Sequence, residues 1–435
     1  MTEITTSLLT LDARTQKRNA AERRFRAYGL AAVLTGLLLL VILLVSVLSN
    51  GLGAFRQTFV TVDITLDRAQ IEEAEAALVK TKIYRGFIED NIAASLEAAG
   101  VTEANDASAA ADLLSKDAAA SLRDWARTRL ESDGEKWSKS FDFLAAGRID
   151  GYLKGRVTME SAALDSKVTP EQLQLADTLR DAGVLVVKFN TGFFTLPDAS
   201  ENQVEAAGLG VAILGSAYLM LIVLFLALPI GVAASIYLEE FAPKNRLTDL
   251  IEVNISNLAA VPSIVFGILG LAIFINFIGL PQSAPIVGGL VLTLMTLPTI
   301  IISTRAALKA VPPSIRDGAL GVGASPMQTV FHHVLPLAAP GILTGTIIGL
   351  AQALGETAPL LLIGMVAFVR EYPAGPPEGF FDPASALPVQ VYNWTQRADP
   401  AFFERASGAI IVLLIFLAIM NITAVFLRRK FERRW

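Results

Sequence analysis

The chain has 435 residues, of which 53% are hydrophobic and only 18% are charged. Soluble domains carry about 25% charged residues, so the composition argues against a single water-soluble globule. With 36 Lys+Arg against 41 Asp+Glu the formal net charge is −5, which argues against nucleic acid as a partner. The chain has no cysteine, which excludes disulfides, thiolate metal sites and cysteine nucleophiles.

Six apolar runs are long enough to cross a bilayer as helices, which takes about 20 residues. The runs are 29–48, 208–236, 255–278, 285–304, 337–369 and 407–427. The first run is too long for the apolar core of a typical signal peptide, and no small-residue cleavage pattern follows it. We therefore expect it to be retained as an anchor.

Positive charge flanks the two ends of this series. Lys and Arg precede the first run at Arg14, Lys17, Arg18, Arg23, Arg24 and Arg26, and follow the last at Arg428, Arg429, Lys430, Arg433 and Arg434. By the positive-inside rule both ends are expected in the cytoplasm, which requires an even number of crossings. The run 337–369 could hold two helices, but a seventh crossing would place the C-terminal arginines outside. We therefore expect one helix, with an oblique or re-entrant stretch after Pro359.

A soluble segment at 49–205, here called the insert, separates the first two runs. It holds 17 Lys+Arg and 26 Asp+Glu, a net charge of −9, and the topology places it outside the cytoplasm. It is long enough for its own core and is predicted to be mostly helical. The predicted helices are 67–99, 106–133 and one that begins at Pro170, with Thr169 and Gln172 forming a capping box; 184–189 and 193–196 are predicted as strands.

Glu356 is the only charged residue inside the six runs. A carboxylate near the bilayer centre costs about 2.5–3.5 kcal/mol on insertion scales, so it should face a cavity or a partner. Around it, Gly355 permits close approach, Thr357 supplies a hydroxyl and Pro359 frees a backbone carbonyl. The alternative is an ion pair with a cation on another helix, which would only hold the bundle together.

The loop 305–336, between the fourth and fifth runs, is predicted to be cytoplasmic. Its apolar residues Leu320, Met327 and Phe331 lie close to small residues, and Gly323 is placed for a turn between two short helices. An exposed amphipathic helical hairpin of this kind is typical of a docking surface for a partner protein.

This loop resembles the signature of bacterial ABC-importer permeases, which runs Glu-Ala-Ala, three residues, Gly, nine residues, Ile, one residue, Leu-Pro. The corresponding positions are Asp317, Gly318, Ala319, Gly323, His333, Leu335 and Pro336, with Arg316 directly before them. Gly318 and His333 depart from the pattern. In that family the loop sits in a groove of the ATPase subunit and transmits its closure to the membrane helices. The resemblance therefore implies an ATPase-coupling loop that includes Arg316.

Two further segments look like the phosphate-transport permease of the PstA type. They are Asn-Leu-Ala-Ala-Val-Pro-Ser-Ile-Val-Phe-Gly at 257–267 and Gly-Glu-Thr-Ala-Pro-Leu-Leu at 355–361. The resemblance covers 206–431 and implies an all-α polytopic membrane protein with six transmembrane helices, to which the insert is an addition. Gln352 stands where the family commonly carries an arginine.

The family resemblance also implies partners and a location. The partners are a second, PstC-like permease, a PstB-like ATPase dimer that holds ATP and Mg²⁺, and an external PstS-like phosphate-binding protein. The location is the bacterial inner membrane, with membrane lipid around the helices. The implied domains are a cytoplasmic tail at 1–28, an anchor at 29–48, the extracytoplasmic insert at 49–205, the permease core at 206–427 and a second tail at 428–435.

Phosphate needs hydrogen-bond donors along its path. The candidates are the hydroxyls of Ser263 and Thr357 and the amide of Gln352; Glu356 has the wrong sign to bind phosphate directly, so we expect it to orient a cation on the partner subunit or to act in gating. Arg305 is either an exit-side anion contact or an interfacial anchor. No Gly-rich ATP-binding loop occurs in the sequence, so ATP hydrolysis is expected on a separate chain and no cofactor on this one.

Alternatives stay open at this point. The same architecture would import sulfate, molybdate or another oxyanion. A membrane sensor with an external domain is a distant possibility, because the cytoplasmic parts hold no signalling module. The adjacent residues His332 and His333 have no carboxylate or thiolate neighbours and fit loop residues better than a metal site. The insert is expected to dock or position the binding protein.

Overall fold

The computed structural model describes residues 13–98, 106–132, 134–366 and 368–431. The chain falls into two compact units, 1–50 and 51–435. The first is dominated by α1 (Ala13–Gly51), which carries the predicted anchor and is long and apolar enough to cross a membrane. Ala99, Asp133, Arg433 and Arg434, which belong to predicted features, lie outside the described residues.

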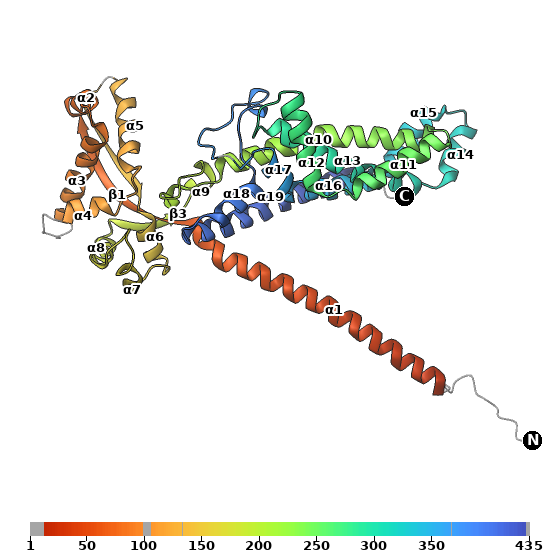
Figure 1. Ribbon diagram of the computed structural model, residues 1–435, viewed down its shortest axis with the longest axis horizontal. Helices are drawn as coiled ribbons and strands as arrows, with labels where there is room; N and C mark the ends of the chain where they lie inside the picture. The colour runs from red at the N-terminus through yellow and green to blue at the C-terminus, as the bar shows by residue number, and fades with distance from the viewer. Residues whose placement is uncertain (1–12, 99–105, 133, 367, 432–435) are drawn as a thin grey trace, which may run out of the picture. The chain divides into compact units, whose positions relative to one another are not determined.

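A three-stranded antiparallel sheet forms the centre of the insert (Figure 1). Its central strand β1 (Arg56–Asp67) pairs with β2 (Lys136–Leu144) and β3 (Leu185–Phe189), so that Phe59 faces Leu144 on one side and Val186 on the other. Helices pack on one face of the sheet, and the shared core includes Val60, Val62, Ile64, Leu66, Ile88, Ile92, Leu122, Leu173 and Leu179. The opposite face carries polar side chains such as Thr61, Asp63, Thr65 and Asp142 as well as Phe59, Leu144 and Val186.

The helices of the insert agree with the prediction better than the strands do. The helix at α8 (Pro170–Asp181) begins as predicted, with the Thr169 hydroxyl accepting from the Gln172 backbone N–H and the Gln172 side chain accepting in return. The predicted helix 67–99 divides into α2 (Arg68–Ala76) and α3 (Lys80–Ala98), and the predicted helix 106–133 divides into α4 (Asp106–Asp112) and α5 (Ala118–Leu130). The other helices are α6 (Gly147–Leu153), α7 (Met159–Ala162) and α9 (Gly192–Thr195).

The strand predictions need correction in two respects: two strands were missed, and one predicted strand is a helix. Strands β1 and β2 were absent from the prediction, although β1 alternates strictly and buries Val60, Val62 and Ile64 on one face. The predicted strand at 193–196 is wrong, because this segment forms the helical turn α9. There the ring of Phe193 is buried at 5.5 Å from Phe55 and 6.1 Å from Trp394, so packing decides its conformation. The predicted strand 184–189 is confirmed as β3.

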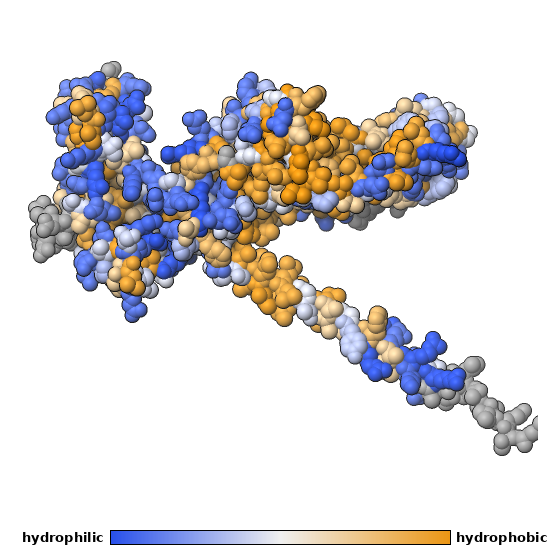
Figure 2. All heavy atoms as spheres, viewed as in Figure 1, coloured by the Kyte–Doolittle hydropathy of each residue, from blue (hydrophilic) through white to orange (hydrophobic). Residues whose placement is uncertain are grey.

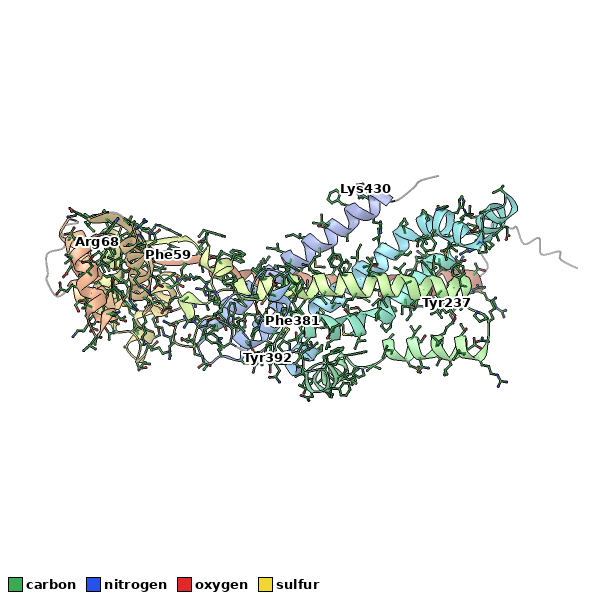
Figure 3. All side chains as sticks on the ribbon, turned by 90° about the horizontal axis from the view of Figure 1, so that it is seen from above. Phe59, Arg68, Tyr237, Phe381, Tyr392 and Lys430 are labelled. Atoms are coloured by element: carbon green, nitrogen blue, oxygen red, sulfur yellow. The ribbon has the colours of Figure 1, made fainter. Side chains whose placement is uncertain are left out.

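Long helices form the core that follows the insert. They are α10 (Gly210–Ile236) with its π-helical extension η3 (Tyr237–Phe241), α13 (Pro285–Lys309), α16 (Leu335–Gly355) and α19 (Ala401–Phe431). Tyr237 and Lys430, labelled in Figure 3, mark the far ends of α10 and α19. The shared core includes Leu219, Val223, Val287, Val291, Ile300, Leu350 and Leu354. Figure 2 shows apolar side chains over these helices and hydrophilic ones over the insert.

The third predicted span is not one helix. The segment 255–278 divides between α11 (Arg246–Ala259) and the continuous pair α12 (Ser263–Gly270) and η4 (Leu271–Phe277), with a bend of 100° between them. Pro262 explains the break, because proline lacks the N–H for a helical hydrogen bond and disfavours helical backbone in the preceding residue. Within the described residues, five helices are long and apolar enough to cross a membrane, or six if the bent pair counts as one span.

The fifth span is one long helix followed by a separate short element, and the break lies slightly earlier than the predicted position after Pro359. Helix α16 stops at Gly355 and is followed by α17 (Ala358–Leu362), so the break lies just before Pro359. The remaining elements are η1 (Leu52–Phe55), η2 (Val204–Ala206), α14 (Pro313–Gly321), α15 (Pro326–Gln328), η5 (Thr329–Val334), η6 (Glu378–Phe380) and α18 (Leu387–Gln396).

Candidate translocation and coupling sites

Glu356 lies at the break between α16 and α17 rather than inside a helix. Its backbone is extended, with φ −78° and ψ 132°, and its side chain is half-buried. No hydrogen bond or ion pair joins this carboxylate to any residue in the described part of the chain. The predicted alternative of an ion pair within the bundle therefore has no counterpart among the described residues, and a partner outside this chain or water must solvate the charge.

The helix that begins at Ser263 packs against the one that follows Glu356. A Cβ on Gly267 of α12 would lie 2.7 Å from the Cα of Pro359, so only glycine permits this approach. The two breaks in the apolar core thus belong to neighbouring elements. The hydroxyls of Ser263 and Thr357 and the amide of Gln352 have no hydrogen-bond partner among the described residues. Gln352 is exposed on α16, one turn before the break.

Arg305 bridges three elements at one end of the core. Its Nη2 lies 2.6 Å from Oε1 of Glu252 on α11, and its Nε lies 3.3 Å from Oε2 of Glu239 on η3. The arginine side chain is only 15% exposed. The guanidinium is therefore already paired with two carboxylates and ties α13 to both neighbours. The sequence pattern did not reveal this role, because the three residues are 53 and 66 positions apart.

The hairpin predicted in the loop 305–336 is present, but its second arm is not a separate short helix, because α15 (Pro326–Gln328) continues without a break into α16. Helix α14 ends at Gly321, Gly323 adopts φ +90°, and Ser325 caps α15 through a capping box with Gln328. The positive φ requires glycine or another residue that tolerates left-handed backbone. Apolar side chains point outward from the hairpin: Leu320, Val322, Met327 and Phe331 are 47%, 87%, 56% and 47% exposed. Exposed apolar side chains gathered on one hairpin are typical of a partner-binding surface.

Arg316 fastens this hairpin to the core. Its Nη2 and Nε lie 2.7 and 3.2 Å from the two carboxylate oxygens of Glu240 on η3, a bidentate pair. The guanidinium also donates to the backbone oxygens of Leu308 and Val311 at the end of α13, at 2.9 and 2.8 Å. The hydrogen bonds from Glu240 raise the pKa of Arg316 above its ordinary value.

The other residues of the predicted coupling loop divide into two groups. Ala319 is buried on α14, which packs against η5, and Leu335 and Pro336 are half-buried where they begin α16. Asp317 and Gly318 are exposed. The exposed histidines of η5 belong to no group of three metal-ligating side chains, and none was found anywhere in the described residues.

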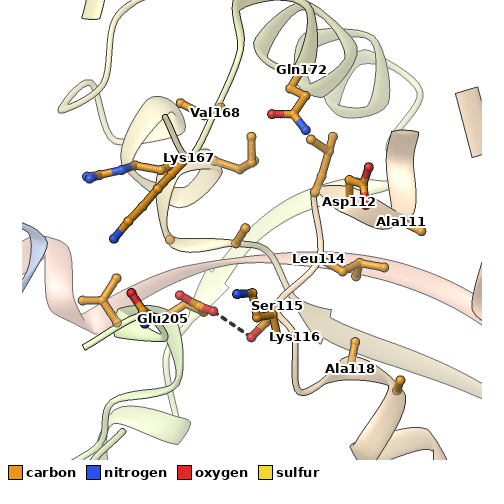
Figure 4. A pocket seen from close by; sticks show the side chains of 18 of the residues that line it. Ala111, Asp112, Leu114, Ser115, Lys116, Ala118, Lys167, Val168, Gln172 and Glu205 are labelled. Atoms are coloured by element: carbon orange, nitrogen blue, oxygen red, sulfur yellow. Dashed lines mark hydrogen bonds between the residues drawn. The ribbon is translucent and has the colours of Figure 1, made fainter. Parts of the chain in front are cut away.

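A cavity of about 420 Å³ lies in the insert beside the segments that lead into α10 and α19 (Figure 4). Among the residues that line it, Ser115 donates a hydrogen bond from its hydroxyl to Oε1 of the buried Glu205 at 2.7 Å. Burial raises the pKa of the Glu205 carboxyl. The charged side chains that line it are Arg85, Lys116, Arg148, Lys167, Asp112, Glu201, Glu205 and Asp399. Because cations and carboxylates are equal in number, the lining does not select for an anion.

Two protein families match different parts of the chain. The family described as "Binding-protein-dependent transport system inner membrane component" matches residues 227–435. A domain of unknown function, DUF3333, matches residues 12–163, which cover α1 and most of the insert. The first match contains the hairpin, Arg305 and the break at Glu356, whereas the second has no assigned activity.

The chain is also similar to curated transport proteins. It is 33% identical over 236 residues to the probable ABC transporter permease protein YqgI of Bacillus subtilis, which covers 52% of this chain and 80% of that protein. It is 31% identical to the phosphate transport system permease protein PstA of Mycobacterium leprae, covering 53% and 73%. It is 30% identical to the probable PstA of Methanocaldococcus jannaschii, covering 50% and 75%.

Solved structures give only a weak overlap. An inward-facing MetNI methionine ABC transporter overlaps 51% of this chain and 97% of its own at 18% identity, with a TM-score of 0.40. A bacterial alginate ABC transporter overlaps 51% and 79% at 14% identity, also with a TM-score of 0.40. Likenesses at this score carry no argument about the site.

Proposed function

Because this chain belongs to the family of binding-protein-dependent transport system inner membrane components, we propose that it is the permease subunit of an ATP-driven importer of inorganic phosphate. The identity of the substrate is inferred from the similarity to phosphate permeases of the PstA type, which spans about three quarters of the length of those relatives. Sulfate, molybdate or another oxyanion is the second candidate, favoured by Gln352 where phosphate permeases commonly carry arginine.

The unpartnered polar groups at the helix breaks support a pathway in this region. Ser263, Thr357 and Gln352 can each donate a hydrogen bond to an oxyanion that sheds its hydration shell. Glu356 would repel phosphate, so in this proposal it orients a cation on the partner permease or acts in gating. Arg305 serves the cytoplasmic end by holding α10, α11 and α13 together, because its charge is already paired.

The partners follow from the same proposal. The apolar hairpin with Gly323 at its turn docks into a cytoplasmic ATPase dimer that binds ATP and Mg²⁺, and a second permease completes the pathway. Both chain termini lie in the cytoplasm, and the insert lies on the extracytoplasmic side, where it meets a phosphate-binding protein. The basic residues in the first turns of α1 and in the last turn of α19 support this orientation.

Uptake of radiolabelled phosphate by source cells with and without this gene tests the substrate. A second phosphate system must be deleted first, and sulfate and molybdate are added as competitors. We expect loss of a saturable, energy-dependent component that neither competitor inhibits. Unchanged phosphate uptake would overturn the substrate and direct attention to the other oxyanions.

Glu356→Gln tests the proposed pathway. The substitution keeps the shape of the side chain and removes its charge, so we expect phosphate uptake to fall while the complex still assembles. Glu371→Gln, at an exposed position in a loop, is the matched control and should leave uptake unchanged. Normal transport by the Glu356 variant would show that its charge plays no part in the pathway.

A further inference from the structure

A buried ion cluster joins the insert to the first turns of α19. Glu404 of α19 accepts from Lys154 Nζ at 3.0 Å and from Arg156 Nε at 2.8 Å. Asp150 of α6 lies 2.7 Å from the same Lys154 Nζ and 3.3 Å from Arg156 Nη2. The side chains of Lys154, Glu404 and Asp150 are 9%, 9% and 4% exposed. Two cations and two carboxylates thus neutralise one another, and of the four only Arg156, at 30%, is substantially exposed.

The cluster reaches the central strand of the insert. Oδ1 of Asp150 accepts from both the backbone N–H and the hydroxyl of Thr58 on β1, each at 3.0 Å. Strand β1 pairs with both other strands, so its position determines that of the whole sheet. Through Asp150, Lys154 and Glu404, the sheet and α19 are therefore connected by a continuous set of short polar contacts.

A second buried contact lies beside the cluster. Arg405, which is 3% exposed, donates from Nη2 to Oε1 of Gln57 on β1 at 2.5 Å and to the backbone oxygen of Glu205 at 3.2 Å. Its guanidinium also lies 5.5 Å from the ring centre of Phe193. Consecutive residues of α19 are thus held by different elements of the insert and its connections, which fixes the rotation of the helix as well as its position.

Glycines bring the backbones close together at the same place. A Cβ on Gly53 of η1 would lie 2.7 Å from the carboxyl carbon of Glu404, and a Cβ on Gly408 would lie 2.6 Å from the Cβ of Ala54. Contacts this close leave no space for one segment to slide past the other. Opening the junction would in addition leave buried charges without partners, which is strongly unfavourable.

We propose that Lys154 and Arg156 are positioning residues for α19, so that the insert and the outer part of this helix move as one rigid body. A protein that docks on the insert then acts on α19 directly, and α19 packs against α16, the helix that ends at the Glu356 break. This inference assigns the insert a mechanical part in the transport cycle, and it rests on the proposed function for the ATP-driven cycle and for the identity of the transported ion.

Spin labels test the rigid-body claim, since the chain has no native cysteine to remove. Leu164→Cys in the insert and Phe403→Cys on α19 place labels at sites that are 93% and 56% exposed. The distance between the labels is measured in the complete membrane complex, without nucleotide and with trapped ATP. We expect one narrow distribution that is the same in both states. Two different distances would overturn the rigid body.

Glu404→Gln, combined with the same labels, tests the positioning role. It removes one carboxylate and leaves Lys154 and Arg156 with Asp150 alone, so we expect the distance distribution to broaden. Maximal uptake per assembled complex should fall about fivefold, while the half-saturating phosphate concentration stays the same. Asp142→Asn is the control, because it breaks an exposed ion pair with Lys188 on the uncovered face of the sheet.

The outcomes separate this inference from the proposed function. A narrow distribution and full uptake in the Glu404→Gln variant would overturn the positioning role. A Glu404→Gln variant that merely misfolds is recognised by reduced amounts of assembled complex. Lys154→Arg, introduced alone, keeps the charge at the junction and should leave the distribution narrow. Absence of phosphate uptake in the unmodified protein would instead count against the substrate, and the label distances would still decide the rigid-body claim.

Discussion

The two ends of the core are both tied by ions, but in different surroundings. At the outer junction each carboxylate meets both cations; the side chains of Asp150, Lys154 and Glu404 are at most 9% exposed, and that of Arg156 is 30% exposed. At the hairpin, Arg316 and Glu240 form one pair with side chains 22% and 10% exposed, and the apolar surface beside them is open. The same type of interaction therefore joins the insert and the hairpin to the core with unequal strength.

The difference indicates which joint moves. A buried cluster cannot lose one contact without leaving a charge desolvated, whereas a partly exposed pair can exchange its partner for water at small cost. We therefore expect the insert to follow α19 closely and the hairpin to change its angle to α10 and α13. The hinge would then lie beside the hairpin surface on which the proposed ATPase docks, and the rigid joint would lie at the opposite end of the core. This arrangement suits a transport cycle that alternates between two conformations.

Removing Asp150 should have the largest effect. Asp150→Asn leaves Lys154 and Arg156 with one carboxylate and weakens the contacts to Thr58, so we expect a loss of about 3–5 kcal/mol in the stability of the insert. Thermal unfolding of the detergent-solubilised complex measures it. Lys188→Met is the control. It removes one partner of the exposed ion pair with Asp142 and should shift the unfolding temperature very little. Equal shifts for the two variants would remove the contrast between buried and exposed pairs.

A substitution that strains the hairpin turn should have the second-largest effect. Gly323 has φ +90°, and Gly323→Ala places a side chain in left-handed backbone at a cost of about 1–2 kcal/mol. We expect less ATPase to co-purify with the complex and uptake to fall in proportion. Gly321→Ala is the matched control, because Gly321 lies at the end of α14 with open space around its Cβ position. Equal behaviour of both variants would show that the turn geometry is unimportant for docking.

A pair of double-mutant cycles compares the two joints directly. For Glu240→Gln and Arg316→Met we expect a coupling energy of about 1 kcal/mol, because the pair is partly exposed. For Glu404→Gln and Lys154→Met we expect a larger coupling energy, since both groups are buried. Chemical unfolding of the purified complex gives both values. A hairpin coupling equal to or above that of the outer pair would contradict the proposed division into a rigid joint and a hinge.

The smallest expected effect concerns pH at the outer junction. Burial raises the pKa of Glu205 above the 4.5 of an exposed glutamate, so the folded protein holds this proton more tightly than the unfolded chain does. The contribution to stability is therefore complete below about pH 4.5 and is lost as the pH rises through the raised pKa. Glu205→Gln should unfold at a higher temperature than the unmodified protein at pH 8, and the difference should shrink at pH 5. A difference independent of pH would contradict the raised pKa.

Sequence patterns were sufficient for features that depend on neighbouring residues. The apolar runs identified the long helices, the Thr169 and Gln172 cap identified the start of α8, and Gly323 identified the turn of the hairpin. The third span is an intermediate case. Its length and hydropathy predicted one helix, and Pro262 marked the break, but the 100° bend depends on how α11 and α12 pack on other elements.

Sequence by itself determined that the chain is a membrane protein with an acidic insert and an apolar hairpin, because hydropathy and turn chemistry are local properties. Only the tertiary structure decided that Glu404 meets Lys154 across 250 positions, that Arg305 is bound by two glutamates and that Glu356 has no partner among the described residues. Charged residues look alike in a sequence whether they are paired or free. Their partners come from distant elements, and burial sets the strength of each pair only when the chain has folded.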